Sequence, residues 1–229
     1  MRIISDIQKN LQLDNITYRD PFDYDKSPYA KIKFPELGSI DLFKIVDKPY
    51  ANSSKNTLAE LESISTSTHN RSQADLHLIY TVDTDPLILF RELSEDLSIN
   101  FSENLFHNIY RFSVLHIINH LKLFYNRARP FQLAEKLDID IDRIITKTHH
   151  TASYPSGHTM YAALAAEILI SDYPEHKNKF DGVTKQVGLA RVLQGVHYPS
   201  DNRASVEIMK TIFPNLKKYY TTEEQRHEL

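Results

Sequence analysis

The spacing of apolar residues predicts a buried helix in the middle of the chain. Between Asn104 and Asn126, apolar side chains recur at steps of three and four, which is the spacing of one helix face. These side chains are Phe106, Tyr110, Val114, Ile117, Leu121 and Phe124. Lys122 also lies near this face, because it follows Ile118 by four residues. We therefore expect Lys122 to be partly buried, which is unusual for a lysine.

From Pro86 onward the pattern becomes helical. Proline suits the first position of a helix, and proline or glycine often follows the last one. Four helices are expected in this part of the chain. The first begins at Pro130, and the second covers the apolar run Met160 to Ile170. The third extends from about Lys179 to Val196, and the fourth from Ser200 to Ile212. We expect the 160–170 helix to end near Tyr173-Pro174, and the residues after Pro214 to form a polar, frayed tail.

The first part of the chain lacks this helical spacing. Residues 1–56 are interpreted as irregular, and two short alternating runs, Tyr29 to Phe34 and Ser39 to Val46, can pair as a small N-terminal β-hairpin. Polar runs at 51–56 and 63–72 are typical of loops or helix caps. The expected organisation is an irregular segment over 1–75 packed on the core, a helical catalytic domain over 76–215, and a tail over 216–229.

Composition narrows the classes of partner and location. The chain has 229 residues, with 27 Lys and Arg against 30 Asp and Glu, so no broad basic field favours nucleic acid. It has no cysteine, which excludes disulfides and thiolate metal sites. No apolar stretch is typical of a secretory signal or a membrane span, so a cytoplasmic location is expected. Helix faces left uncovered would favour a homodimer.

A candidate anion site lies at residues 151–159, Thr-Ala-Ser-Tyr-Pro-Ser-Gly-His-Thr. Pro155 and Ser156 stand where the 160–170 helix is expected to begin, so its free backbone N–H groups would face this segment. A helix N-terminus attracts phosphate. A serine-capped helix after a turn would look the same, so this segment alone does not decide between binding and structure.

Three cations are candidates for the same anion. Pro130 disfavours helical geometry at Arg129 and turns it away from the preceding helix, so Arg129 and Lys122 can close on one ligand. Arg191 lies between Gly188 and Gly195, which either clear space around its guanidinium or let helices pack closely. Lys122 can equally be a core lysine whose ammonium reaches solvent past the helix end.

A histidine and an aspartate follow Arg191. Pro199 is expected to end the helix near His197. Across that turn, Asp201 can accept the proton of one ring nitrogen of His197 and leave the lone pair of the other nitrogen free. An imidazole held in this way is a nucleophile. An ordinary histidine beside a helix-capping aspartate would have the same spacing.

Taken in order, these residues resemble a three-part family signature. Its parts are Lys122 with Arg129-Pro130, then Pro155-Ser156-Gly157-His158, then Arg191, His197 and Asp201. The spacing is similar to that of the type 2 phosphatidic acid phosphatase superfamily, which includes class A nonspecific acid phosphatases and vanadium haloperoxidases. Ala190 departs from the signature, which usually has serine before the arginine.

The resemblance implies a fold and a set of roles. The fold is an all-α helical bundle of the acid phosphatase and vanadium haloperoxidase type. Phosphate is bound by Lys122, Arg129, Arg191 and the backbone near Ser156 and Gly157. His197 is the nucleophile and forms a phosphohistidine, Asp201 orients it, and His158 protonates the leaving alcohol and then activates water. No metal or other cofactor is implied.

The resulting hypothesis is a metal-independent phosphatase for soluble phosphomonoesters that is inhibited by vanadate. The first alternative is a vanadium haloperoxidase, in which His197 holds vanadate as the cofactor. The second alternative is a protein that binds a phosphorylated ligand without hydrolysing it, although simple binding does not need His158 and His197. His149 and His150 are interpreted as part of a solvated loop, with substrate or metal contact as the alternative.

Overall fold

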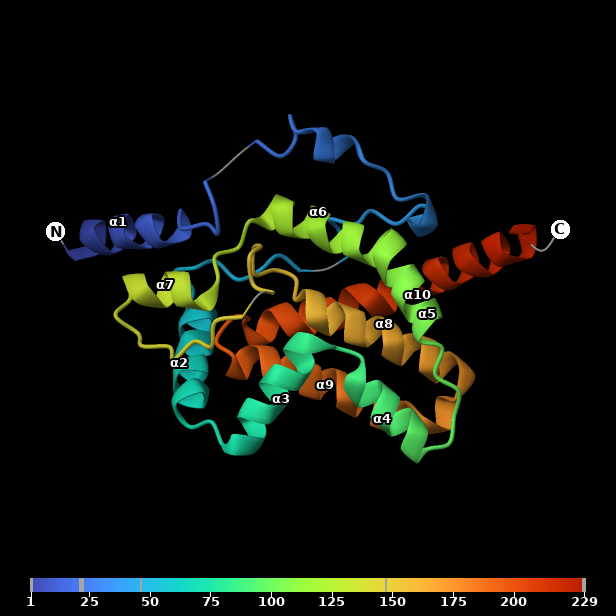
Figure 1. The fold of residues 1–229 in the computed structure, drawn as a ribbon. Coiled ribbons are helices and arrows are strands. Elements are labelled where there is room, and N and C mark those ends of the chain that lie inside the picture. The colour runs from blue at the N-terminus through green and yellow to red at the C-terminus, as the bar shows by residue number, and fades with distance from the viewer. Residues whose placement is uncertain (1, 21–22, 46, 147, 228–229) are drawn as a thin grey trace.

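The computed structural model is a helical bundle built around three central helices. It describes residues 2–20, 23–45, 47–146 and 148–227. Helix α8 (Gly157–Asp172) packs against both α9 (Lys177–Leu193) and α10 (Pro199–His227), and the three cross the middle of the molecule (Figure 1). No β-strand occurs in the described residues, which confirms the all-α fold class.

Helix α8 is central because it is apolar on every side. Every residue from 159 to 166 is buried. A helix without a polar face needs other helices around it. Here α5 (Glu103–Ile109) and α6 (Leu115–Tyr125) also contact α8, in addition to α9 and α10. The short helix η4 (Pro174–His176) follows α8, as the Tyr173-Pro174 signal predicts.

The helix expected between Asn104 and Asn126 is present with one irregularity. Its two α-helical parts, α5 and α6, are joined by a π-helical turn, η3 (Tyr110–Val114). The predicted inward face is buried at Phe106, Val114, Ile117 and Leu121, whereas Phe124 is 37% exposed. The apolar spacing therefore identified the helix but not the π-turn, which adds one residue to a turn.

The N-terminal part is more helical than expected. Residues 2–14 form α1 (Arg2–Asp14), so the irregular assignment is wrong there. The β-hairpin is also wrong, because its residues form the 3-10 turns η1 (Pro28–Lys31) and η2 (Pro35–Leu37); Val46 lies outside the described residues. Each turn begins with a proline, which fixes the backbone and lacks the N–H that a strand pairing needs.

The two polar runs before residue 75 each supply a helix-capping serine, but residues 63–69 of the second run are helical, so the loop-or-cap interpretation is wrong for them. The Ser54 hydroxyl accepts a hydrogen bond from the backbone of Thr57 at 3.1 Å and begins α2 (Lys55–His69). Ser72 and Asp75 form reciprocal hydrogen bonds that begin α3 (Gln73–Thr84). Helix α4 (Ile88–Asp96) follows, and α3 and α4 both contact α9. This region is therefore continuous with the bundle.

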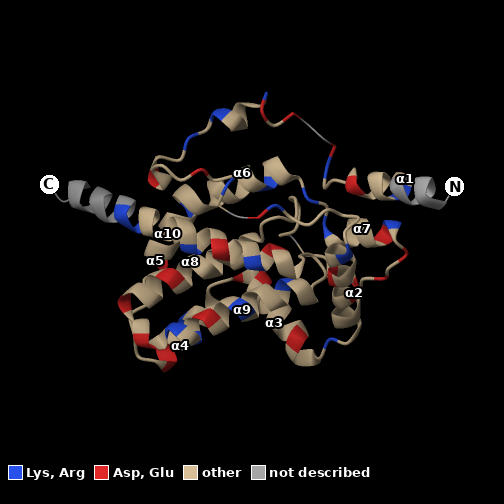
Figure 2. Cartoon of the chain, turned by 180° about the vertical axis from the view of Figure 1, so that it is seen from behind, with Lys and Arg blue, Asp and Glu red and all other residues tan. Residues whose placement is uncertain are grey.

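The last helix is longer than expected. Helix α10 continues through Pro214 to His227, so the frayed tail after Pro214 is wrong for residues 215–227. A proline removes one helical hydrogen bond, but tertiary contacts compensate. Leu216 is fully buried, and Asn215 donates a hydrogen bond of 2.6 Å to the Leu37 carbonyl. Figure 2 shows basic and acidic residues interspersed along the helices rather than separated on two faces.

Candidate active site

One short stretch, residues 148–152, contacts all three predicted cations. The hydrogen bonds run from Lys122 Nζ to the Ala152 carbonyl, from Arg129 Nε to the Thr151 carbonyl (2.9 Å), and from an Arg191 terminal nitrogen to the Thr148 hydroxyl (3.0 Å). The cations come from the end of α6, the start of α7 (Pro130–Lys136) and the end of α9. The fold therefore brings together side chains that are far apart in the sequence.

The link between α6 and α7 positions Lys122 and Arg129. Lys122 lies in the last turn of α6 and is only 7% exposed, which confirms the expected burial. Asn126 then adopts a left-handed conformation (φ 44°) that ends the helix. Arg129 has an extended backbone before Pro130, as predicted, and its side chain is directed inward with 1% exposure. Both charges are thus held in the interior.

Arg191 lies in the last turn of α9 and is also 1% exposed. The idea that Gly188 and Gly195 clear space around its guanidinium is wrong. A side chain at Gly188 would meet Asn202 at 3.2 Å, and one at Gly195 would meet Ile141 at 2.8 Å. Close packing, the alternative interpretation, accounts for both glycines. Gly195 in addition has a φ of +80°, which side chains rarely adopt.

His197 follows α9 and is held from both sides of its ring. Nδ1 lies 3.1 Å from Oδ2 of Asp201, and Nε2 lies 2.9 Å from a terminal nitrogen of Arg129. Because the carboxylate only accepts and the guanidinium only donates, Nδ1 carries the proton and Nε2 presents its lone pair. The predicted orientation by Asp201 is therefore present.

The charges around His197 favour its neutral form. Burial and the positive charge of Arg129 hold the pKa of His197 well below its ordinary value, although Asp201 opposes them. Burial alone would raise the pKa of Asp201, but Arg127 and the hydrogen bond to His197 hold it well below its ordinary value. A neutral imidazole beside a fixed carboxylate results, and this is the state in which histidine can attack an electrophile.

The positive charges of the site repel one another, and a bound anion would reduce this repulsion. Burial and the charges of Arg129 and Arg191 hold the pKa of Lys122 well below its ordinary value. Burial lowers the pKa of Arg129 to about 10, and Arg191 adds to this effect. Like charges in a low-dielectric interior repel strongly. The site therefore suits an oxyanion.

The start of α8 faces the same site. Ser156 is the N-cap residue and is fully buried, and Gly157 and His158 form the first turn. The Ser156 hydroxyl bonds to that of Thr159 at 2.9 Å instead of capping the backbone. His158 is half-buried, and burial together with Arg191 holds its pKa well below the ordinary value. The Ser156 side chain therefore does not cap the backbone N–H groups of this first turn.

Several residues of the site were not identified from the sequence. Arg127 donates to Oδ1 of Asp201 at 2.6 Å and its guanidinium lies 3.9 Å from the centre of the Tyr198 ring. Ser153 donates to Oδ2 of Asp201 at 2.5 Å. Arg127 and Arg129 are two residues apart in an extended stretch, so their side chains lie on the same side. This spacing was the available signal in the sequence that Arg127 also points inward.

Two carboxylates from distant helices complete the surroundings. Glu60 on α2 accepts hydrogen bonds from the backbone and hydroxyl of Ser200 at 2.6 and 2.8 Å, next to Asp201. Asp83 on α3 accepts a hydrogen bond of 2.6 Å from Arg191. More than a hundred residues separate each carboxylate from its partner, and no local pattern in the sequence indicates either contact.

The two adjacent histidines differ from one another. His149 is 5% exposed, so the solvated-loop interpretation is wrong for it, whereas His150 is exposed as expected. Their rings stack with centroids 5.2 Å apart, and Phe131 contacts His149 edge-on. Burial, with the nearby charges of Arg129 and Arg143, lowers the pKa of His149 to about 4. His149 is therefore a neutral, buried side chain that packs at the edge of the site.

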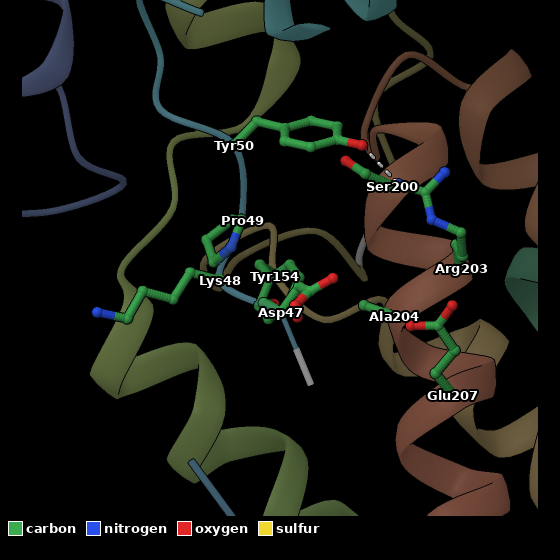
Figure 3. Close-up of a pocket in the computed structure, with 9 residues that line it drawn as sticks. All are labelled: Asp47, Lys48, Pro49, Tyr50, Tyr154, Ser200, Arg203, Ala204 and Glu207. Carbon is green, nitrogen blue, oxygen red and sulfur yellow. Dashed lines mark hydrogen bonds between the residues drawn. The ribbon is translucent and has the colours of Figure 1, made fainter. Parts of the chain in front are cut away.

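The segment 47–50 lies against Tyr154 and the first turns of α10. A pocket of about 70 Å³ lies between this segment, Tyr154 and the first turns of α10 (Figure 3). The Tyr154 hydroxyl donates to the Asp47 carbonyl at 2.7 Å, and Arg203 donates to the Tyr50 hydroxyl at 2.9 Å. The N-terminal part of the chain is thereby attached to both the 151–159 segment and the helix that carries Asp201.

Comparison with known families agrees with this geometry. The family model described as the PAP2 superfamily matches residues 106–220, which is half of the chain and contains every predicted site residue. The chain belongs to the PAP2 superfamily. Glu60, Asp83 and the segment 47–50 lie before the part that matches the PAP2 model.

Curated relatives within the superfamily are bacterial phosphatases. The chain is 31% identical over 98 residues to a non-specific acid phosphatase of Salmonella typhi, covering 43% of this chain and 39% of that protein. It is 35% identical over 80 residues to one of Salmonella typhimurium (strain LT2), covering 35% of this chain and 32% of that protein. The chain thus matches less than two fifths of the length of either relative.

A solved PAP2 structure is also similar. It is the transmembrane PAP2 type phosphatidylglycerolphosphate phosphatase from Bacillus subtilis, with a TM-score of 0.47, 19% identity, and coverage of 74% of this chain and 88% of that one. The expected cytoplasmic location is contradicted by this match to a transmembrane protein, and we withdraw it. Among the described residues, no helix combines the length and apolar character needed to cross a membrane.

Proposed function

We propose that this PAP2 protein is a metal-independent phosphatase that hydrolyses soluble phosphomonoesters through a phosphohistidine on His197. The observation that carries the proposal is the position of His197 Nε2. It lies 2.9 Å from a terminal nitrogen of Arg129, while Asp201 accepts from Nδ1 on the other side of the ring. A phosphate oxygen that accepts the Arg129 hydrogen bond in place of His197 would free the Nε2 lone pair and bring phosphorus next to it.

The proposed reaction has two steps. In the first, the negative charge of the bound phosphate raises the pKa of His158, so that His158 holds a proton. His197 Nε2 then bonds to phosphorus, the bond between phosphorus and the ester oxygen breaks, and His158 gives its proton to that oxygen as the alcohol leaves. In the second, water bonds to phosphorus and loses a proton to His158, the phosphorus–nitrogen bond breaks, and phosphate leaves. Asp201 keeps the proton on Nδ1 and stabilises the positive charge that His197 acquires.

Protein cations take the role that a metal ion has in many phosphatases. Lys122, Arg129 and Arg191 neutralise the charge on the equatorial oxygens of the transferring group. The backbone at Gly157 adds donors from the helix N-terminus. A side chain at Gly157 would meet the nearest protein atom, on Ile118, at 3.9 Å, so packing does not demand glycine there. Close approach of an oxyanion to the backbone would explain it.

The test is turnover of 4-nitrophenyl phosphate in the presence of EDTA. We expect hydrolysis by the wild-type chain, inhibition by micromolar to millimolar orthovanadate, and loss of turnover in His197→Ala by a factor of about 10³ or more. His107→Ala is the matched control, because His107 is an exposed histidine of α5. Turnover of His197→Ala at the wild-type rate would disprove the role of His197.

The intermediate can be tested separately. Quenching the wild-type enzyme during turnover of a radiolabelled phosphomonoester should leave label on the protein that is stable in alkali and released in acid, as expected for a phosphorus–nitrogen bond. Label should be absent in His197→Ala. Halide oxidation after vanadate loading would instead support the haloperoxidase alternative, and tight phosphate binding without turnover would support the binding protein.

A further inference from the structure

A carboxylate lies at the edge of the proposed phosphate site. Oδ1 of Asp83 accepts hydrogen bonds from a terminal nitrogen of Arg191 at 2.6 Å and from the Thr146 hydroxyl at 2.9 Å. The Thr148 hydroxyl donates to the same oxygen. Asp83 belongs to the last turn of α3 and precedes the residues that match the PAP2 model. The proposed reaction assigns it no role.

Asp83 leaves part of Arg191 available. One terminal nitrogen of Arg191 bonds to Asp83 and the other to Thr148, while Nε is buried and has no hydrogen-bond partner among the described residues. A buried guanidinium N–H without an acceptor is costly, so this edge favours an oxyanion. Asp83 therefore lies beside the position of the phosphate and does not fill it.

Asp83 binds Arg191 directly and lies within electrostatic reach of His158. Its charge acts on His158, the proposed acid, and raises the pKa of that histidine against the effects of burial and Arg191. Asp83 is also 13% exposed, whereas Arg191 is 1% exposed. The carboxylate is thus more exposed than the guanidinium that it binds.

Asp83 remains ionised at neutral pH. Burial raises the pKa of its carboxyl, but hydrogen bonds from Thr148 and Arg191 outweigh burial and lower it below the ordinary value. Glu60, which also lies near the site, is bonded to Ser200 behind His197 and is separate from this position. Asp83 therefore provides a negative charge at the Arg191 edge of the proposed phosphate site, within electrostatic reach of His158.

We propose that Asp83 sets the charge preference of the enzyme by disfavouring phosphomonoesters whose leaving group carries a negative charge close to phosphorus. Repulsion between two carboxylates in a partly buried site is weakly screened. Neutral and cationic alcohols avoid this repulsion. The inference rests on the proposed phosphatase activity and names the class of monoester that this site accepts.

The test compares three alkyl phosphates of similar size. They are 2-hydroxyethyl phosphate, which has a neutral leaving group, 2-aminoethyl phosphate, which has a cationic one, and carboxymethyl phosphate, which has an anionic one. We measure kcat/KM by phosphate release for the wild type, for Asp83→Asn and for Asp96→Asn. Asp96 is an exposed aspartate of α4 and serves as the matched control.

The expected result is a change in the ratio of neutral to anionic substrate. Asp83→Asn should lower this ratio by about tenfold or more relative to wild type, which corresponds to about 1.4 kcal/mol. Because each ratio compares the same two substrates, differences in intrinsic reactivity cancel. Asp96→Asn should leave the ratio unchanged. An unchanged ratio in Asp83→Asn would overturn the inference, and if that variant does not fold, Asp83→Ser decides by the same criterion.

Failure of the phosphatase proposal would be distinguishable from failure of this inference. If the wild type hydrolyses neither 4-nitrophenyl phosphate nor any of the three alkyl phosphates, the phosphatase proposal fails, and calorimetric binding of inorganic phosphate and pyrophosphate takes the place of turnover. Pyrophosphate carries a second anionic group where a leaving group would lie. Asp83→Asn should then tighten pyrophosphate binding about tenfold relative to phosphate, and equal changes for both ligands would overturn the role of Asp83.

Discussion

Arg127 and His197 bind opposite oxygens of one carboxylate, that of Asp201. Arg127 donates to Oδ1 at 2.6 Å, and His197 Nδ1 lies 3.1 Å from Oδ2. Asp201 is completely buried and Arg127 is 4% exposed. A buried carboxylate without a cation would have a raised pKa and would orient the histidine poorly. The ion pair behind His197 is therefore a condition for the geometry of the nucleophile.

The first prediction concerns the charge of Arg127. Arg127→Met should destabilise the chain by about 3–5 kcal/mol, because it leaves a buried carboxylate without its partner. Arg127→Lys should lose less stability than Arg127→Met, because it keeps the positive charge next to Asp201. It should still be less stable than the wild type, because it loses the hydrogen bond to Ser200. Urea unfolding at pH 7 measures both.

The pH profile separates a positioning role of Arg127 from a purely structural one. If Arg127 keeps Asp201 ionised, the acid limb of kcat/KM for 4-nitrophenyl phosphate should move to higher pH in Arg127→Met and less so in Arg127→Lys. Equal stability losses with unchanged pH profiles would show that Arg127 serves packing alone.

Much of the site was predictable because its residues carry local signals. Pro130 and Pro199 mark where helices begin, and Pro130 turns Arg129 away from a helical path. The apolar spacing before Asn126 places Lys122 on a buried face. These features depend only on nearby residues, so the sequence is sufficient to predict them.

The remaining parts depend on contacts between distant segments. Asp83 and Glu60 lie on helices whose own sequences indicate ordinary surface positions. Pro214 normally ends a helix, but the contact between Asn215 and Leu37 compensates for its missing hydrogen bond. Such outcomes follow from packing of the whole chain, and no local pattern in the sequence predicts them.

The second prediction concerns stability in mild acid. The pKa of His149 is lowered to about 4 from an ordinary value of 6.5, so between these values the unfolded chain binds a proton that the folded chain does not. Stability should therefore rise with pH across this window and level off above about pH 6.5. The contribution of His149 should be a fraction of the slope of about 1.4 kcal/mol per pH unit that one full proton gives.

His149→Gln removes this titration without touching the proposed nucleophile or acid. Urea unfolding at several values between pH 4.5 and pH 7.5 should give a shallower slope for the variant than for the wild type. His150→Gln, which changes the exposed neighbour, is the matched control and should keep the wild-type slope. Identical slopes for His149→Gln and wild type would contradict the prediction.

The third prediction concerns ligand binding. Phosphate should stabilise the folded chain, because it relieves repulsion among Lys122, Arg129 and Arg191. At one hundred times its dissociation constant the gain is about 2.7 kcal/mol, seen as a higher Tm. Arg191→Met should lose most of this gain. Sodium chloride at equal ionic strength controls for screening, and an equal shift with chloride would argue against a specific site.

The last prediction uses two glycines with opposite surroundings. Gly195 has a φ of +80°, and a side chain there would meet Ile141 at 2.8 Å, so Gly195→Ala should destabilise the chain by about 1–3 kcal/mol. Gly182 lies inside α9 with no atom within 4 Å of an added side chain, so Gly182→Ala should stabilise it by about 0.5–1 kcal/mol. Urea unfolding of both variants should therefore give changes of opposite sign. Because Gly195 lies between Arg191 and His197, only Gly195→Ala should also lower turnover of 4-nitrophenyl phosphate. Equal changes in stability and turnover for the two variants would show that the turn does not require glycine at position 195.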